Sequence, residues 1–289
     1  MKRVIALGFF DGVHIGHGAL LKRAAELAEE LGALPSVMTF DIPPMKSVEL
    51  ITSPAERAAI IHEQYGIDDI ILLHFDEELR KMRWNDFILM LREKYGAVCL
   101  VAGYDFRFGY MGEGDSEKLK SECAALGLGS EIIGKVELCG EAVTSTRIRE
   151  LIAQGDLEKA AEYLGHPFSI SGRVAHGRRI GHALGAPTVN LTPPMGKLLP
   201  ARGVYASRTV LDSGEAFCGI TNVGVRPTVS DSGRVSIETH LFDFDADLYG
   251  REIKVEFLKF LRGERRFSDI SELRAQIELD GAAAQKYFE

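Results

Sequence analysis

Gly8-Phe9-Phe10-Asp11-Gly12-Val13-His14-Ile15-Gly16-His17 follows a short apolar run, Val4–Leu7, and precedes an alanine- and leucine-rich segment, Ala19–Leu31. The run predicts a strand and the segment predicts a helix, so the quoted stretch is a strand-to-helix turn. In an open α/β sheet, ligands bind beyond the carboxyl ends of the strands. A helix N-terminus offers a phosphate free N–H groups and the positive end of a dipole. This stretch therefore predicts a phosphate-binding turn.

The two histidines of this turn lie three residues apart, so they can meet on one face of the first helical turn. Imidazoles there could donate hydrogen bonds to phosphate oxygens as charge develops in a transition state. A lone histidine more often caps a helix or fills space. The pair, the glycines around it and the position after a strand favour a site instead. The spacing G-x-G-x-x-G is absent, so the turn is not a dinucleotide fingerprint.

Strand and helix signals alternate through the first half, which predicts a parallel sheet with right-handed crossovers. Ser53-Pro54-Ala55-Glu56 is a capping box that predicts a helix to about Tyr65. The other predicted strands are Ser36–Phe40, Ile70–Phe75, Val98–Ala102 and Glu131–Val136, and the other predicted helices are Asn85–Tyr95, Glu117–Leu126, Thr146–Gln154 and Leu157–Leu164. Gly165-His166-Pro167 interrupts this pattern, so we expect an α/β, Rossmann-like domain over residues 1–165.

Beyond this point, short strand-like runs are separated by Gly, Pro, Asn and Asp, which favours a small antiparallel barrel or sandwich. Ile270–Tyr287 predicts a closing amphipathic helix with Ser268 or Asp269 as its cap. The predicted strands are Ser169–Val174, Thr188–Leu191, Val204–Val210, Phe217–Val223, Val235–Phe242 and Glu252–Leu261. We therefore expect a second domain over residues 166–289, with a β-barrel and a C-terminal helix.

The composition limits the classes of partner. The 289 residues carry a formal net charge of −8, which disfavours nucleic-acid binding because that function usually needs a basic face. The longest apolar runs are too short to span a bilayer, and the N-terminus begins a strand rather than a signal peptide. We therefore expect a cytoplasmic protein without membrane or nucleic-acid partners. No CxxC pair occurs, so neither a zinc site nor a redox motif is predicted from Cys99, Cys123, Cys139 and Cys218.

Two further segments have the residue types of a nucleotide site. Gly103-Tyr104-Asp105-Phe106-Arg107-Phe108-Gly109 combines aromatic faces for a flavin or adenine ring with an arginine for phosphate. A hydrophobic loop packed on the core explains this segment equally well. Ser145-Thr146-Arg147-Ile148-Arg149 opens a helix where hydroxyls and an arginine could cradle a phosphate. Taken alone, the second segment is better interpreted as an ordinary Ser/Thr cap.

His14-Ile15-Gly16-His17 resembles the H-x-G-H signature of the nucleotidyltransferase superfamily. With the two segments above, the first half is similar, more narrowly, to the bacterial bifunctional riboflavin kinase/FAD synthetase family. The resemblance implies that His14 and His17 contact ATP phosphates during adenylyl transfer and that Arg147 stabilises charge beside them. It also implies nucleotide or flavin contacts for Gly8, Phe9, Asp11, Gly16, Asp105, Phe106, Phe108, Ser145 and Thr146.

The second half holds its own candidates for phosphate transfer. A kinase needs a loop over phosphates, oxygen ligands for Mg²⁺, a base for the attacking hydroxyl and nearby positive charge. Thr188 and Asn190 are hard oxygen donors two apart on a strand, so they could share one Mg²⁺, and Glu238 could accept a hydroxyl proton. Such residues also occur in the turns and solvated faces of any small barrel, so residue types alone do not indicate a kinase.

The segment Gly165–Phe267 resembles a riboflavin kinase module, including Pro187-Thr188-Val189-Asn190 and Ile237-Glu238-Thr239-His240. The resemblance implies that Thr188 and Asn190 bind Mg-ATP and that Glu238 is the base. Further ligand contacts are expected from Gly177, Arg178, Arg179, Gly181, Gly185 and Arg262. Over the whole chain, the resemblance implies an enzyme that phosphorylates riboflavin to FMN and then adenylylates FMN to FAD, with ATP as the donor in both steps and pyrophosphate released in the second.

Two positions depart from the family pattern. Asp41-Ile42-Pro43-Pro44 stands where a Pro-His-Pro-like turn is frequent, so we assign that loop no catalytic part. His182 stands where arginine is frequent, which would weaken a fixed positive charge in the kinase loop. Two alternatives stay open: a nucleotidyltransferase for another phosphorylated small molecule, with the barrel only aiding binding, and a non-catalytic flavin or nucleotide sensor. Small molecules are the expected partners, and the sequence is also compatible with weak self-association.

Overall fold

The computed structural model describes residues 1–41, 48–175, 188–225 and 235–289. The chain divides into two compact units, Met1–Ser145 and Thr146–Glu289. The predicted domain boundary lies C-terminal to this division, and helices α6 (Ser145–Gln154) and α7 (Leu157–Leu164) occupy the interval. α7 packs on strands of the second unit, so these helices are described with the barrel. The predicted boundary between the two functional domains, after residue 165, stays a prediction.

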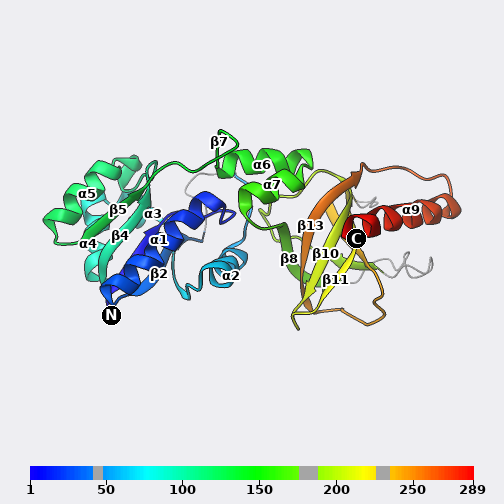
Figure 1. The fold of residues 1–289 in the computed structure, drawn as a ribbon, viewed down its shortest axis with the longest axis horizontal. Coiled ribbons are helices and arrows are strands. Elements are labelled where there is room, and N and C mark those ends of the chain that lie inside the picture. Colours follow the sequence, from blue (N-terminus) through cyan, green and yellow to red (C-terminus); the bar gives the residue numbers. More distant parts are fainter. Residues whose placement is uncertain (42–47, 176–187, 226–234) are drawn as a thin grey trace. The chain divides into compact units, whose positions relative to one another are not determined.

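Within its described residues, the first unit contains a parallel sheet with the strand order β3-β2-β1-β4-β5. Figure 1 labels β2, β4 and β5 of this sheet. The sheet confirms the predicted α/β, Rossmann-like architecture. The edge strand β5 begins and ends earlier than the predicted Glu131–Val136. The strands are β1 (Arg3–Leu7), β2 (Leu34–Phe40), β3 (Asp69–Leu73), β4 (Ala97–Gly103) and β5 (Gly129–Ile133).

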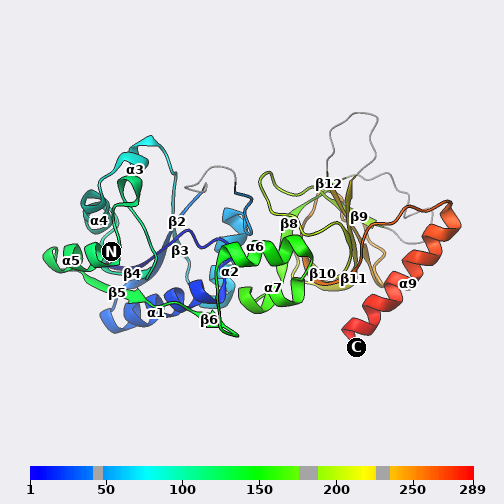
Figure 2. The ribbon, with the colours of Figure 1, turned by 90° about the horizontal axis from the view of Figure 1, so that it is seen from above.

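Helices cover both faces of this sheet. Val4 and Ala6 of β1 pack with α1 and α2, whereas Ile5 and Leu7 pack with α4 and α5. Figure 2 shows α1 and α4 on opposite sides of the sheet. Because β1 is buried on both faces, a ligand can reach only the loop beyond its carboxyl end. The helices are α1 (Ile15–Leu31), α2 (Pro54–Tyr65), α4 (Trp84–Glu93) and α5 (Ser116–Ala125).

The predicted capping box is confirmed, whereas the shortest elements were missed. Ser53 Oγ accepts a hydrogen bond from the Glu56 N–H at 3.2 Å, and Glu56 Oε2 accepts one from the Ser53 N–H at 2.8 Å. The missed elements are too short for a periodic pattern to reveal them. They are α3 (Glu77–Lys81), the 3-10 turn η1 (Tyr110–Gly112) and the hairpin of β6 (Glu137–Leu138) and β7 (Glu141–Ala142).

The described part of the second unit forms a closed antiparallel barrel with the order β10-β11-β12-β9-β8-β13, so the barrel prediction is confirmed and the sandwich is excluded. Asp269 caps the C-terminal helix α9 (Ile270–Phe288) by accepting a hydrogen bond from the Glu272 N–H. α9 packs on the barrel around Ala284. The strands are β8 (Phe168–Ala175), β9 (Thr188–Leu191), β10 (Gly203–Leu211), β11 (Ala216–Val225), β12 (Val235–Leu241) and β13 (Glu252–Arg262).

Strand alternation separates the barrel interior from its outer wall. Thr239 of β12 is buried inside the barrel, where its Oγ1 lies 2.9 Å from Thr221 Oγ1, which in turn lies 2.7 Å from Ser207 Oγ. These hydroxyls link β10, β11 and β12 across the interior. Because successive residues point to opposite faces, Glu238 and His240 face outward. The barrel wall is therefore where a ligand can meet them.

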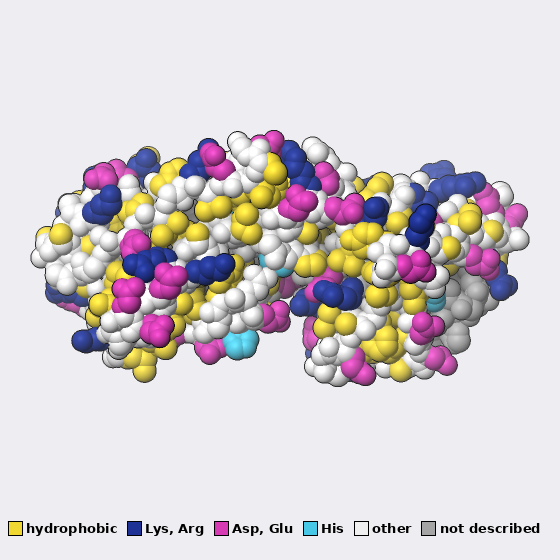
Figure 3. Space-filling model, viewed as in Figure 1, with side chains coloured by type: hydrophobic (Ala, Val, Ile, Leu, Met, Phe, Trp, Pro, Cys, Tyr) yellow, Lys and Arg dark blue, Asp and Glu magenta, His cyan; other side chains and the backbone are white. Residues whose placement is uncertain are grey.

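The surface carries charges of both signs. On the face shown in Figure 3, acidic and basic side chains are interspersed rather than gathered in one patch. Among the helices of the described residues, none has the length and apolar character needed to cross a membrane.

We predict that Gly109→Ala destabilises the first unit more than Gly32→Ala does. Both glycines have positive φ, +75° at Gly109 and +57° at Gly32, but only a Cβ at Gly109 would clash, lying 2.6 Å from backbone atoms of Trp84. We expect a loss of about 1 kcal/mol for Gly32→Ala and of at least about 3 kcal/mol for Gly109→Ala. Trp84 is the chain's single tryptophan, so urea unfolding followed by its fluorescence measures this unit. Equal losses would contradict the prediction.

Candidate functional site

The first candidate site lies where the strand order of the sheet reverses. β1 pairs with β2 on one side and with β4 on the other, so the loops after β1 and β4 border one crevice. The loop after β1 leads through His14 into α1, and the loop after β4 contains Phe106 and Phe108. The topology thus brings together two motifs that lie far apart in the sequence.

His14 and His17 meet, as their spacing predicts. Their rings are stacked, with centroids 3.5 Å apart and planes 13° apart. His14 is also the N-cap of α1, since its Nδ1 accepts a hydrogen bond from the His17 N–H at 3.2 Å. The cap uses Nδ1, so a hydrogen bond from this ring to a phosphate would come from Nε2. Capping and ligand binding are therefore compatible in one residue.

His17 is held as a neutral ring. Burial lowers the pKa of His17 well below its ordinary 6.5, and the neighbouring His14 and Arg57 lower this pKa further. His17 Nδ1 is shielded from solvent and has no hydrogen-bond partner among the described residues. The ring also meets Phe10 edge-on, with centroids 5.2 Å apart. A neutral imidazole provides one N–H donor for a ligand.

The backbone before His14 is unusual. Phe10, Gly12 and Val13 have φ of 54°, 84° and 41°, a region that residues with a Cβ seldom adopt. The Asp11 carboxylate holds this turn by accepting a hydrogen bond from the Thr52 N–H at 2.9 Å, and Asp11 is only 1% exposed. Asp11 therefore shapes the loop from inside the protein. Its direct contact with a nucleotide stays a prediction.

The glycines of this turn leave room where a side chain would intrude. A Cβ at Gly16 would lie 3.0 Å from His14 Nδ1, the capping atom. A Cβ at Gly8 would lie 3.0 Å from the Phe10 ring. Both glycines thus permit the local packing, and their predicted nucleotide contacts stay predictions.

The aromatic pair after β4 has one core member and one more accessible member. Phe108 is 6% exposed and packs near Phe87, with ring centroids 5.6 Å apart. Phe106 stacks on Phe108 at 5.6 Å and 15° and is only partly buried, and Asp105 is exposed. The core interpretation therefore holds for Phe108. Phe106 and Asp105 have the accessible surface that a ligand contact needs, and that contact stays a prediction.

The first residue of α6 contacts the loop between β1 and α1, residues 8–14, which we call the histidine loop. Ser145 Oγ donates a hydrogen bond to the Asp11 carbonyl at 3.0 Å. Thr146 is exposed, and Arg147 Nη1 lies 3.3 Å from Glu150 Oε2. Ser145 thus lies at the first site, whereas phosphate binding by Thr146 and Arg147 stays a prediction.

The second candidate site lies on the outer wall of the barrel. Glu238 of β12 is directly opposite Asn222 of β11 on one side and Asn190 of β9 on the other. Thr188, two residues before Asn190, is opposite His240. Side chains of directly paired residues share a face, with Cβ atoms about 4.5–5.5 Å apart. The register therefore brings the predicted Thr188, Asn190 and Glu238 to one patch.

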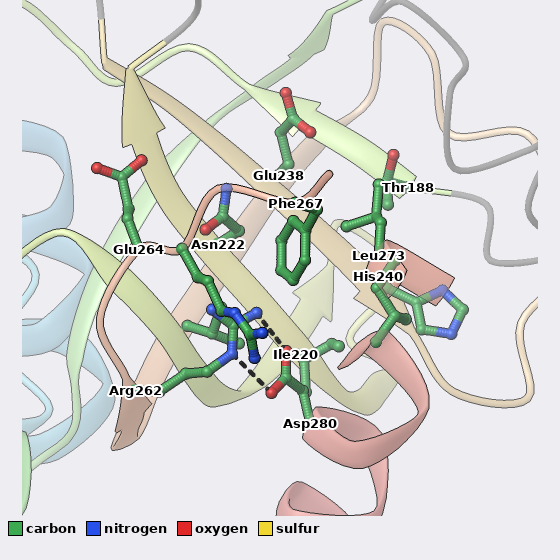
Figure 4. Close-up of a pocket in the computed structure, with 13 residues that line it drawn as sticks. Thr188, Ile220, Asn222, Glu238, His240, Arg262, Glu264, Phe267, Leu273 and Asp280 are labelled. Carbon is green, nitrogen blue, oxygen red and sulfur yellow. Dashed lines mark hydrogen bonds and ion pairs between the residues drawn. The ribbon is translucent and has the colours of Figure 1, made fainter. Parts of the chain in front are cut away.

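A cavity of about 280 Å³ opens on this wall, with α9 on its other side. Thr188, Asn222 and Glu238 line it from the barrel, and Leu273 lines it from α9. In Figure 4 the ring of Phe267 projects into the middle of the cavity. A largely apolar cavity with a few convergent polar groups is typical of small-molecule sites.

Arg262 lines the same cavity, but its charge is already paired. Its Nε and Nη2 donate to the two carboxylate oxygens of the buried Asp280 at 2.8 and 2.7 Å. This bidentate pair ties β13 to α9 and lies at the opposite end of the view from Glu238 in Figure 4. Arg262 therefore has a clear structural role, and its predicted ligand contact stays a prediction.

Some of the predicted site residues cannot be compared with the structure. Conversely, the structure places residues at the sites to which the sequence analysis gave no role. Ile42–Pro44, Gly177, Arg178, Arg179, Gly181, His182 and Gly185 lie outside the described residues. Residues without a predicted role include Arg57, Asn222, Glu264, Phe267, Leu273 and Asp280. Asn222 could have been found from strand pairing with Glu238, whereas the others depend on tertiary packing that no local pattern reveals.

Comparison with known proteins connects both halves of the chain with one family. Residues 1–147 match the family model for FAD synthetase, and residues 164–288 match the model for riboflavin kinase. A bifunctional riboflavin kinase/FMN adenylyltransferase from Pseudomonas fluorescens is 38% identical, over 98% of this chain and 92% of its own length. The protein of the same name from Bacillus subtilis (strain 168) is 34% identical, over 99% of this chain and 93% of its own length.

The fold also agrees with a solved structure over almost its whole length. A crystal structure described as a macrolide-efflux protein from Streptococcus pneumoniae aligns with a TM-score of 0.85 and 28% identity, covering 98% of this chain and 94% of that one. Together with the two matching family models and the full-length relatives, this shows that the chain belongs to the family of bifunctional riboflavin kinase/FMN adenylyltransferases.

Proposed function

We propose that the C-terminal barrel phosphorylates riboflavin to FMN and that the N-terminal unit converts FMN to FAD with a second ATP. The activities named for the relatives and the two family models support this assignment. The observation that carries it is that each unit has its own arrangement suited to phosphate chemistry. One is a stacked histidine pair at a helix N-terminus, and the other is Glu238 between Asn190 and Asn222 on the barrel wall.

In the kinase step, the oxygen of the terminal ribityl hydroxyl attacks the γ-phosphorus of ATP, and Glu238 accepts the proton of that hydroxyl. The bond from that phosphorus to the bridging oxygen breaks, and ADP leaves. The cavity beside Glu238 has apolar walls that suit a flavin ring. The position of Glu238 next to the threonine and asparagine of β9 supports its role as the base.

The donor set on β9 fits Mg²⁺. Thr188 and Asn190 supply a hydroxyl and an amide oxygen on one face of the strand, opposite His240 and Glu238. Mg²⁺ prefers hard oxygen ligands and usually shares them with substrate phosphates. We propose that these two residues hold Mg-ATP. When bound, the ion neutralises phosphate charge.

In the adenylyl transfer step, an oxygen of the FMN phosphate attacks the α-phosphorus of ATP, and pyrophosphate leaves. The attacking phosphate is already an anion, so no strong base is required. Positioning and charge stabilisation by His14, His17 and Arg147 carry the step. The stacked rings at the positive end of α1 support this role for the histidines.

The cellular location and the partners of the enzyme stay predictions from the sequence. We expect a cytoplasmic protein, with ATP, riboflavin and FMN as its partners. We expect neither nucleic-acid nor membrane partners, and weak self-association is compatible with the sequence.

Glu238→Gln should lower the rate of FMN formation by about a hundredfold or more, because an amide cannot accept the hydroxyl proton. The assay supplies riboflavin, ATP and Mg²⁺ and separates riboflavin, FMN and FAD over time. FAD formation from added FMN should stay normal, which shows that the first unit is folded and active, and circular dichroism of the variant reports on the barrel. Glu252→Gln, on an exposed carboxylate of β13 that pairs with Arg173, is the matched control. Normal FMN formation by Glu238→Gln would exclude this base.

His17→Ala should reduce pyrophosphate release from FMN and ATP by about a hundredfold or more, the usual effect of losing one donor to developing charge. Riboflavin phosphorylation should be unchanged. His62→Ala serves as the control because His62 lies on the surface of α2, where its Nδ1 is 2.6 Å from Asp68. Undiminished pyrophosphate release in His17→Ala would count against the histidine site.

The neutral state of His17 also predicts a pH effect on stability. Its pKa is lowered in the folded protein from 6.5, so below about pH 6.5 the unfolded chain binds a proton that the folded chain does not. The free energy of unfolding should therefore fall with decreasing pH in that range, by up to about 1.4 kcal/mol per pH unit. Above about pH 7 His17 contributes no pH dependence. The free energy of unfolding, measured by Trp84 fluorescence in urea, should fall less steeply with decreasing pH in His17→Gln than in the parent chain. Parallel plots of this free energy against pH would refute the prediction.

A further inference from the structure

Arg57 is a buried cation beside the first site. It lies in the first turn of α2, directly after the capping box, and its side chain is 0% exposed. A buried charge is costly unless it is paired and hydrogen-bonded. The contacts of Arg57 therefore indicate what its charge does.

Arg57 joins the end of β2 to the segment before α2. Its Nη1 donates to Thr39 Oγ1 at 2.7 Å and to the Phe40 carbonyl at 2.9 Å. Its Nη2 lies 3.5 Å from the Thr52 carbonyl, which accepts a weaker hydrogen bond. A planar guanidinium can serve several acceptors at once, which a lysine cannot do with the same geometry.

The same cluster supports the histidine loop. The guanidinium lies over the Phe9 ring, 4.5 Å from its centroid, and Thr39 donates to the Phe9 carbonyl at 2.8 Å. Thr52 donates to the Asp11 carboxylate at 3.3 Å. Arg57 therefore contacts the loop directly at Phe9 and indirectly through two threonines.

The charge of Arg57 persists at neutral pH. Burial lowers the pKa of Arg57 to about 10, and the Asp11 carboxylate opposes this shift. The positive charge of Arg57 is thus partly balanced by the negative charge of Asp11 within the histidine loop. Strained backbone, such as that of Phe10 and Val13, persists only where the surroundings hold it firmly. The Arg57 cluster provides such surroundings.

We propose that Arg57 is a positioning residue for adenylyl transfer, which holds the loop Phe9–Val13 so that the stacked histidines and the N-terminus of α1 stay aligned on the ATP phosphates. The inference rests on the proposed adenylyl transfer activity. Arg57 acts here through the loop and does not touch the substrate. A displacement of about 1 Å at a reacting group can lower a rate by about a hundredfold.

The kinetic test compares Arg57→Met with Arg57→Lys and with Arg23→Met. The last removes a surface charge from α1, where Arg23 pairs with Glu131 at 2.9 Å. For Arg57→Met we expect kcat for FAD formation from added FMN to fall at least about tenfold, while the KM for ATP changes less than about threefold. Arg57→Lys should recover part of the rate, and Arg23→Met should match the parent chain. A folded Arg57→Met chain with normal kcat would overturn the proposal.

Riboflavin phosphorylation is the internal reference and should stay normal in every variant. Hydrogen exchange provides a readout that does not depend on activity. In Arg57→Met, the amides of Phe9–Val13 should lose protection while those of α4 keep it. Loss throughout the first unit would make Arg57 merely structural and overturn the proposal. If the parent chain forms FMN but no FAD, the adenylyl transfer assignment fails, and the exchange data still decide whether Arg57 holds the loop.

Discussion

Successive side chains of a strand point to opposite faces, and both sites depend on which faces are left uncovered. β1 is buried on both sides by helices, so its residues form core and the ligand site moves to the loop beyond its end. Strand β12 of the barrel instead has one face in the interior and one on the outer wall. Thr239 is buried, whereas Glu238 lines a cavity. The same alternation thus leads to a loop site in one unit and a strand-face site in the other.

The loop site needs support that the strand-face site does not. The barrel wall derives its geometry from strand pairing, which sets Glu238 opposite Asn190 and Asn222 with hydrogen bonds on both sides. The loop after β1 has left-handed residues, and its turn pairs with no strand in the described part of the chain. Its shape depends on the buried Asp11 carboxylate and on threonines that contact Arg57. Buried polar groups therefore replace strand pairing as the source of rigidity.

These differences explain what could be predicted from the sequence. Most strands and helices were correct because their apolar periods and caps are local, as at Ser53 and Asp269. The meeting of His14 with His17 follows from helical spacing, and that of Thr188 with Asn190 from strand spacing. α3 was missed because five residues carry no period. The burial of Arg57 and the pairing of Arg262 with Asp280 could not be predicted, because each needs partners brought close only by tertiary packing.

The two sites also differ in the group that assists the nucleophile, and the proposed reactions give a reason. A ribityl hydroxyl must lose a proton to attack phosphorus, so a carboxylate within reach is useful, and Glu238 lies on an accessible face. An FMN phosphate is already ionised, and a nearby carboxylate would repel it. At the loop site, the Asp11 carboxylate is turned inward and accepts a hydrogen bond from the Thr52 N–H, while the stacked histidines, of which His17 is neutral, lie at the N-terminus of α1. The barrel site therefore has an accessible carboxylate beside a neutral hydroxyl nucleophile, whereas the loop site keeps its carboxylate away from an anionic one.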